Sequence, residues 1–158
     1  RTSDQRETFS LPLSYYQFPE YHNFVAKLSE GELSQLDISK LELVDALDRL
    51  FIFNTEHNRC TYFEFQGDDM TLSSQGQDIG SASERISVSF SGNLHKTAFP
   101  TRHMIEILQH YDSDRVHLTL CGAEGPCGIT GAEDPAYLVI IMPMKIVEET
   151  FYTEEEAQ

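Results

Sequence analysis

The feature that most constrains the fold is an apolar run near the end of the sequence, Ala136–Ile146 (Ala-Tyr-Leu-Val-Ile-Ile-Met-Pro-Met-Lys-Ile). A continuous apolar run of this length is typical of a strand covered on both faces, and Asp134-Pro135 marks its start. Pro143 has no N–H to donate to a ladder, so we expect the strand to leave its sheet there. The flanking methionines are then either gap-filling core side chains or part of a pliable binding surface.

Two helices are predicted upstream of this run. Ser39 and Glu42 form a capping box, which predicts a helix start. The residues that follow place one apolar stripe on this helix: Leu43, Val44, Leu47, Leu50 and Phe51. A second helix is expected to open at Pro100-Thr101, with Met104, Ile105, Leu108 and Tyr111 on its apolar side.

Alternation of apolar and polar residues predicts short strands between and after the helices. These segments are 36–38, 61–66, 70–73, 86–90, 95–99, 116–120 and 127–130. The stretch 74–83 is rich in Ser, Gly and Gln and predicts a mobile loop. Two helices on one side of antiparallel sheets make an α+β domain.

The chain carries a formal net charge of −15. Phosphate binding requires clustered Lys and Arg, so we expect no nucleic-acid binding through the general surface. Three cysteines without framework spacing are typical of reduced thiols. His117, Cys121 and Cys127 lack an evident fourth ligand, so no metal site is predicted. Phosphate-binding, dinucleotide-binding and hydrolase motifs are absent from the sequence, so we predict neither an enzyme nor a cofactor.

Two motifs carry a family resemblance. Phe18-Pro19-Glu20-Tyr21 and the run Ala136–Ile146 resemble the bacterial sliding clamp, the beta subunit of DNA polymerase III. The resemblance implies that residues 1–26 are the last strand of a preceding clamp domain with an interdomain linker. Residues 27–147 are then the C-terminal clamp domain, and 148–158 an acidic tail that we expect to be disordered.

The resemblance also implies function. A clamp is a non-enzymatic processivity factor that encircles duplex DNA and binds polymerase, clamp loader and repair proteins through short peptide motifs of the Gln-x-x-Leu-Phe kind. It implies a homodimer in the full-length protein, a cytoplasmic and nucleoid-associated location, and no membrane contact. The implied peptide-groove residues are Ala26, Pro100, His103, Ile140, Ile141, Met142, Pro143, Met144, Lys145 and Ile146. Ala26 stands where the family usually has proline, and His103 where it can have tyrosine.

Two further sets of residues follow from the resemblance. The subunit-interface positions are Phe51, Ile52, Ile86, Val88 and Phe90, and the DNA-facing positions are Lys40, Arg49 and Arg102. The acidic residues around those cations depart from what a DNA channel requires. An alternative stays open, namely a stand-alone clamp-like interaction module that forms no ring. The first 20 residues separate the two, because in a module they would fold back on their own domain.

Overall fold

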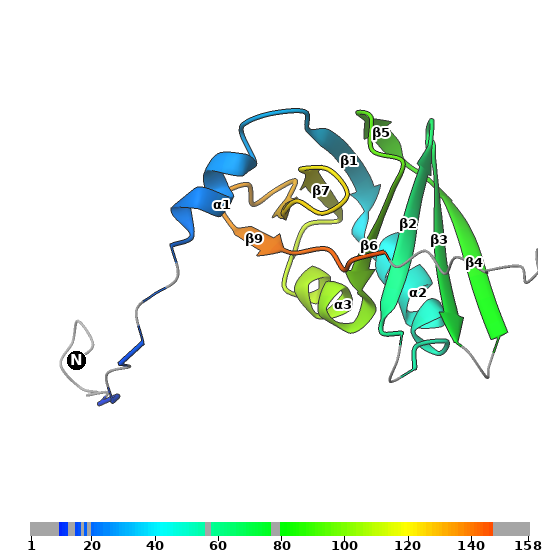
Figure 1. The fold of residues 1–158 in the computed structure, drawn as a ribbon, viewed down its shortest axis with the longest axis horizontal. Coiled ribbons are helices and arrows are strands. Elements are labelled where there is room, and N and C mark those ends of the chain that lie inside the picture. The colour runs from blue at the N-terminus through cyan, green and yellow to red at the C-terminus, as the bar shows by residue number, and fades with distance from the viewer. Residues whose placement is uncertain are drawn as a thin grey trace, which may run out of the picture.

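The protein folds into two antiparallel sheets with the two longer helices on one side, as a computed structural model shows (Figure 1). The structure describes residues 10–12, 15–16, 18, 20–55, 58–76 and 80–146. Within these residues the helices are α1 (His22–Lys27), α2 (Lys40–Phe51) and α3 (Thr101–Gln109). The strands are β1 (Ser34–Ser39), β2 (Cys60–Gln66), β3 (Asp69–Gly76), β4 (Gly80–Ser87), β5 (Ser89–Ser91), β6 (Lys96–Pro100), β7 (Arg115–Leu120), β8 (Cys127–Gly131) and β9 (Leu138–Ile141). The predicted α+β class is confirmed.

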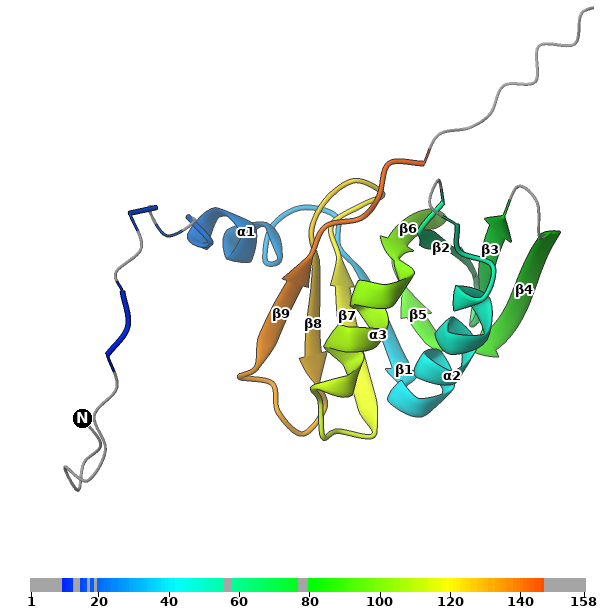
Figure 2. The same cartoon turned by 90° about the horizontal axis from the view of Figure 1, so that it is seen from below.

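The five-stranded sheet has the order β5-β1-β7-β8-β9, and the four-stranded sheet has the order β4-β3-β2-β6. Helices α2 and α3 lie side by side in front of the strands in Figure 2. The helices bury their apolar stripes against the sheets, which makes one core. Its largest fully buried side chains include Phe63, Phe99, Leu47, Leu108 and Leu118.

Helix α2 forms where the capping box predicts it. The Ser39 hydroxyl accepts a hydrogen bond from the Glu42 N–H at 3.4 Å. Leu43, Leu47 and Leu50 are buried, as the stripe requires, whereas Phe51 is exposed at the end of the helix. Helix α3 starts after Pro100 as expected, and its predicted apolar residues Met104, Ile105 and Leu108 are buried.

Two predictions for the segment 74–90 are wrong. The predicted mobile loop 74–83 belongs mostly to β3 and β4, which pair from Asp69↔Ser87 to Gly76↔Gly80. Residues 77–79 at its centre lie outside the described part of the chain. The predicted strand 86–90 is interrupted at Val88, so that β4 belongs to one sheet and β5 to the other. The physical reason is that backbone hydrogen bonding between β3 and β4, not side-chain hydrophobicity, stabilises the Ser-rich ladder.

The apolar run Ala136–Ile146 is not a strand covered on both faces. Only Leu138–Ile141 is a strand, and it is an edge strand that pairs with β8 alone among the described strands. Within it Ile141 is buried and Leu138 is exposed. The strand does end before Pro143, as the missing N–H predicts.

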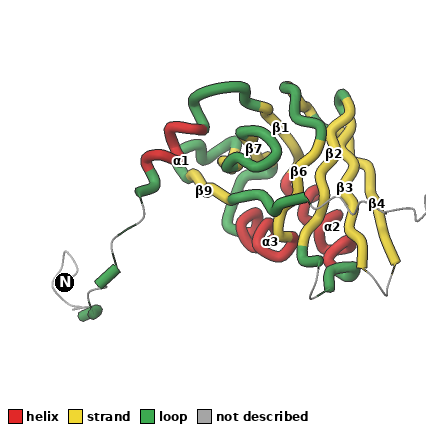
Figure 3. The backbone as a smooth tube through the Cα atoms, in the orientation of Figure 1, coloured by secondary structure: helices red, strands yellow, loops and turns green. Residues whose placement is uncertain are grey.

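The described residues of the range 1–26 contain no strand, although the alternation of Phe9, Leu11 and Leu13 around Pro12 is typical of an edge strand (Figure 3). Phe9 and Leu13 lie outside the described residues, and Leu11 is exposed and not in a strand. Helix α1 follows, which the sequence pattern did not predict. All its residues are exposed, so it has no buried stripe from which to recognise it.

Tyr111 ties the end of α3 to the five-stranded sheet. It is 2% exposed, and its hydroxyl donates to the Ile129 carbonyl oxygen at 2.6 Å. Burial raises the pKa of Tyr111 from 10.0 to about 12. In the unfolded chain the phenol loses its proton near its ordinary pKa, while the folded chain keeps it. The Tyr111 contribution to stability is therefore complete below about pH 10 and is lost as the pH rises toward about 12.

We expect the Tyr111→Phe protein to be less stable than the wild type at pH 8 by about 1 kcal/mol, since one buried hydrogen bond is lost. Between about pH 8 and pH 11 it should lose less stability than the wild type, because phenylalanine does not titrate. Urea unfolding at both pH values measures the difference. Tyr137→Phe is the matched control, because Tyr137 lies against Tyr111 with ring centroids 5.1 Å apart but is 42% exposed. An unchanged stability gap between wild type and Tyr111→Phe at the two pH values would contradict this assignment.

Candidate functional site

The segment after β9 crosses from one sheet to the other. It leaves the five-stranded sheet at Ile141 and passes α3 toward β6, the edge strand of the four-stranded sheet (Figure 1). There the Met144 N–H donates to the Ala98 carbonyl oxygen at 2.7 Å. Pro143 makes this crossing possible, since it ends one ladder and Met144 begins contact with the next strand.

The side chains of this segment form an exposed apolar surface. Met142 is 47% exposed and Met144 is 43% exposed, whereas the other two methionines, Met70 and Met104, are completely buried. Lys145 is exposed, and Pro143 and Ile146 are half-buried. We call residues 142–146, together with the start of α3 at residues 100–103, the methionine surface. Flexible thioether side chains held at a rim are suited to apolar groups of varied shape.

The start of α3 lies next to this segment because Ala98, the partner of Met144, stands two residues before Pro100. Pro100 is half-buried and His103 is exposed. The structure thus brings the predicted groove residues from 142 to 146 close to Pro100 in space, although the two groups are far apart in the sequence. Ile141 is buried and Ile140 half-buried, so they support this surface from β9.

Ala26 lies on α1, on the outer side of the five-stranded sheet. The nearby Leu28 side chain packs over Gly128, beside Leu138. Helix α1 also exposes Phe24 and Val25, preceded by Tyr21. The sequence analysis did not predict this apolar helix surface. The concentration of aromatic residues around Phe18–Tyr21 is the sequence signal from which it could have been found.

The three predicted DNA-facing cations are all held within the chain. The Lys40 ammonium donates to the Tyr111 carbonyl oxygen at 2.6 Å, and Arg102 pairs with Glu106 at 2.9 Å. Arg49 donates two hydrogen bonds to Glu84, at 2.6 and 2.7 Å, which lower the pKa of that carboxyl. The exposed side of α2 also carries acidic residues, namely Glu42, Asp45 and Asp48. This helix face therefore presents little unpaired positive charge to a phosphate backbone.

The predicted interface residues divide into two kinds. Phe51 and Ile52 are exposed at the end of α2, by 42% and 73%. Val88 is buried, and Ile86 and Phe90 pack partly against the core; the Phe90 ring stacks on Phe65 with centroids 4.4 Å apart. Here the exposed apolar surface belongs to the end of α2, and β4 offers its backbone edge.

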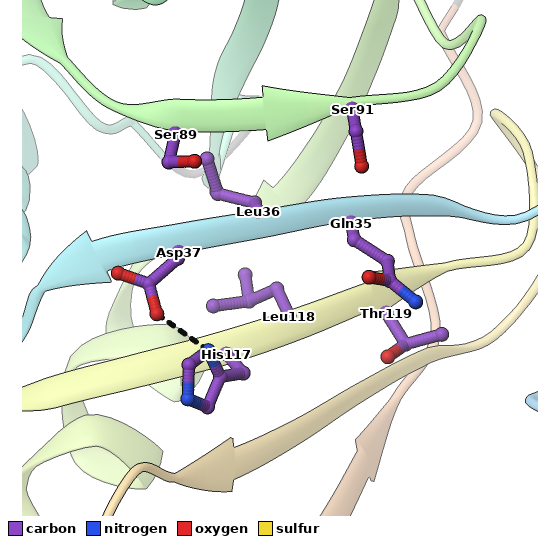
Figure 4. A pocket seen from close by; sticks show the side chains of 8 residues that line it. All are labelled: Gln35, Leu36, Asp37, Ser89, Ser91, His117, Leu118 and Thr119. Carbon is purple, nitrogen blue, oxygen red and sulfur yellow. Dashed lines mark ion pairs between the residues drawn. The ribbon is translucent and has the colours of Figure 1, made fainter.

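A shallow polar depression of about 290 Å³ lies on the outer face of the five-stranded sheet (Figure 4). The Asp37 carboxylate in this depression pairs with Arg115, and the Nδ1 of His117 lies 2.6 Å from that carboxylate. The other polar side chains around it are Gln35, Ser89, Ser91 and Thr119. The Asp37 charge is compensated inside this cluster, so the arrangement is that of a solvated sheet face.

The cysteines behave as structural residues. Cys60 and Cys127 are buried, and burial raises the pKa of both thiols, which keeps them protonated. Among the described residues no group of three or more His, Cys, Asp or Glu side chains is placed to hold a metal ion. The helices that the structure describes are all too short to cross a membrane.

Comparison with known proteins gives a consistent family. The model of the family described as "DNA polymerase III beta subunit, C-terminal domain" matches residues 29–145. The chain is 26% identical over 127 residues to the beta sliding clamp of Chlamydia trachomatis, covering 80% of this chain and 30% of that protein. It is 25% identical over 138 residues to the beta sliding clamp of Rickettsia felis, and the alignment covers 82% of this chain and 36% of that protein.

Solved structures agree in fold. The DNA polymerase III beta subunit of Thermotoga maritima aligns with a TM-score of 0.77 and 23% identity, covering 84% of this chain and 35% of that one. A sliding clamp of Pseudomonas aeruginosa bound to griselimycin aligns with a TM-score of 0.75 and 19% sequence identity, and the alignment covers 84% of this chain and 35% of that one. The chain spans about a third of the length of these relatives. Since the family model covers most of the sequence and the fold agrees, the chain belongs to the family of the C-terminal domain of the DNA polymerase III beta subunit, the bacterial sliding clamp.

Proposed function

We propose that this chain is the third domain of a sliding clamp and that its methionine surface binds short peptide segments of the polymerase and other replication proteins. The observation that carries the proposal is the contrast among its four methionines. Two are fully buried core residues, while Met142 and Met144 stay about half exposed beside a proline that directs them away from the sheet. Apolar side chains held exposed at one place are typical of a binding surface.

The implied peptide would place two or three apolar side chains against Met142, Met144 and Ile146, and backbone groups beyond Met144 would pair with its polar groups. Lys145 is an exposed cation at this site that could pair with acidic peptide groups. Ala26 and α1 lie on the side where the resemblance places the preceding domain. A complete groove is therefore expected only where that domain is present, and this chain alone should bind weakly.

We propose that DNA is held by encirclement in the complete ring, with little direct contact from this domain. The support is electrostatic, because Lys40, Arg49 and Arg102 are engaged within the chain and the net charge is −15. The proposed subunit contact is the exposed end of α2, at Phe51 and Ile52, beside the β4 edge. The stand-alone module required the first 20 residues to fold back. Those of them that the structure describes extend away from the sheets, so this alternative has no support from their position (Figure 1).

Replacement of Met144 by aspartate is expected to weaken peptide binding at least tenfold. An apolar peptide group would then bury a carboxylate that has no partner, and the cost of that desolvation opposes binding. We expect the wild-type chain to bind a Gln-x-x-Leu-Phe pentapeptide with a Kd of about 1 mM, equivalent to about −4 kcal/mol. Titration followed by NMR should show shifts at His103 and at residues 142–146.

The matched control is Met144→Leu, which keeps an apolar side chain of similar size and should retain binding. Because Met144 is exposed in the free chain, the aspartate variant should remain folded, and its amide spectrum verifies this. Equal affinity of the wild-type and Met144→Asp proteins would place the peptide site elsewhere. So would shifts confined to other parts of the domain.

A further inference from the structure

We propose that the methionine surface also binds a segment of its own chain, the aromatic pair Phe151-Tyr152 in the acidic stretch that follows Ile146. This proposal rests on the function proposed above, because it concerns the same surface. The pair would occupy the surface in the absence of a partner peptide and compete with that peptide for it. The stretch 147–158 lies outside the described residues, so the argument begins from its sequence and from the surface next to it.

The stretch reads Val-Glu-Glu-Thr-Phe-Tyr-Thr-Glu-Glu-Glu-Ala-Gln. Its aromatic residues are the adjacent pair Phe151-Tyr152, with glutamates on both sides. Burial of aromatic side chains away from water is favourable, and each contact of a thioether sulfur with an aromatic ring adds about 0.3–1.5 kcal/mol of favourable free energy. Met142 and Met144 are the two methionines of the chain with exposed sulfur-bearing side chains. The chemistry of the pair therefore matches that of the surface.

The distance along the chain also fits. Phe151 follows Ile146 by five residues, which limits the reach to about 18 Å. A four-residue turn brings its first and last residues within about 7 Å, so a turn at 147–150 suffices to return Phe151 toward Met144. A longer linker would lower the effective concentration of the pair at this surface, and this one is short.

Charge favours the same contact. The five glutamates of the stretch stand at positions 148, 149 and 154–156, after Lys145, which is exposed. Arg59 is also exposed, and its backbone oxygen accepts a hydrogen bond from the Thr101 N–H at the start of α3. The nearby carboxylate Glu106 is paired with Arg102. Exposed cations at this surface would thus attract the acidic stretch, whereas the exposed face of α2 with Glu42, Asp45 and Asp48 would repel it.

The test uses the full chain with methionine methyl groups labelled with carbon-13. Met70 and Met104 are completely buried and serve as internal references, while Met142 and Met144 report on the surface. The Phe151→Ala/Tyr152→Ala variant removes both rings, and Thr150→Ala/Thr153→Ala is the matched control with the rings intact. We expect loss of the rings to move the Met142 and Met144 signals, with those of Met70 and Met104 unchanged. The control should resemble the wild type.

The same proteins are then titrated with the Gln-x-x-Leu-Phe pentapeptide. For a short linker with a millimolar effective concentration, removal of the rings should tighten peptide binding about two- to tenfold. If the peptide binds all proteins equally and the Met142 and Met144 signals do not change, the contact with Phe151-Tyr152 is wrong while the proposed function stands. If the methyl signals move but no protein binds peptide, the contact stands and the proposed function is wrong. Methyl shifts that disappear on dilution would show that a second copy supplies the rings, which overturns the intramolecular contact.

Discussion

Replacement of Phe63 by alanine is expected to lower the free energy of unfolding by about 3–5 kcal/mol. Phe63 is completely buried in β2, and its ring meets that of Phe99 edge-on with centroids 5.3 Å apart. β2 lies between β3 and β6 in the four-stranded sheet, under both long helices. Removal of the ring leaves a cavity that the paired strands cannot close, so the lost transfer energy and the cavity cost add.

The matched control is Phe51→Ala, the same substitution at a ring that is 42% exposed. It should change the stability by no more than about 1 kcal/mol, because water already reaches that side chain. Urea unfolding followed by circular dichroism measures both variants. If Phe63→Ala does not fold, Phe63→Leu gives the smaller loss of the same sign. Equal losses for the two alanine variants would mean that Phe63 does not lie in the core.

Replacement of Gly92 by alanine should be the other strongly destabilising change. Gly92 has a φ of 134°, a conformation that side-chain-bearing residues rarely adopt. A Cβ there would lie 2.2 Å from the Ser34 hydroxyl oxygen and 2.6 Å from the Ser34 Cα. The Cα belongs to β1 and cannot move alone, and the hydroxyl accepts a hydrogen bond from the Leu94 N–H at 3.1 Å. Backbone strain and overpacking each cost about 1–3 kcal/mol.

Gly67→Ala separates these two costs. Gly67 also has a positive φ, 63°, but a Cβ there meets nothing within 4 Å. The Gly67→Ala protein should therefore be destabilised only by the conformational cost of the positive φ, about 1–2 kcal/mol. We expect Gly92→Ala to lose at least about 2 kcal/mol more than Gly67→Ala in the same unfolding measurement. A similar loss for both would show that Ser34 yields easily to the added methyl group.

The parts of the fold that local chemistry determines could be predicted from the sequence. The Ser39 cap and the stripe of Leu43, Leu47 and Leu50 are enough to specify α2, because they act within one helix. The first half of β4, residues 80–83, could not be predicted, since its small residues show no apolar alternation and owe their order to backbone pairing with β3. Helix α1 was missed for a related reason, because its apolar residues lie on the surface and make no stripe.

The candidate site shows the same division. Pro143 alone predicts where β9 must end, because the missing N–H is a local property. The exposure of Leu138 depends on the position of β9 at the edge of its sheet, which the order of the strands determines. The Arg102–Glu106 pair is local, because the two residues lie four positions apart on α3. The contacts of Lys40 with the Tyr111 carbonyl and of Arg49 with Glu84 depend on the assembled fold, since the partners are far apart in the sequence.

Two of the places where the chain connects the two sheets have a consequence for cooperativity. At one side the chain passes from β4 to β5 through Val88, which is buried and whose N–H donates to the Asp68 oxygen at 2.8 Å. At the other side the segment after β9 reaches β6 through Met144 and Ala98. Neither sheet can open by itself without breaking one of these crossings and exposing the helices that both sheets share. The domain should therefore unfold as one unit, and a partner that holds Met144 against β6 would slow the opening of both sheets together.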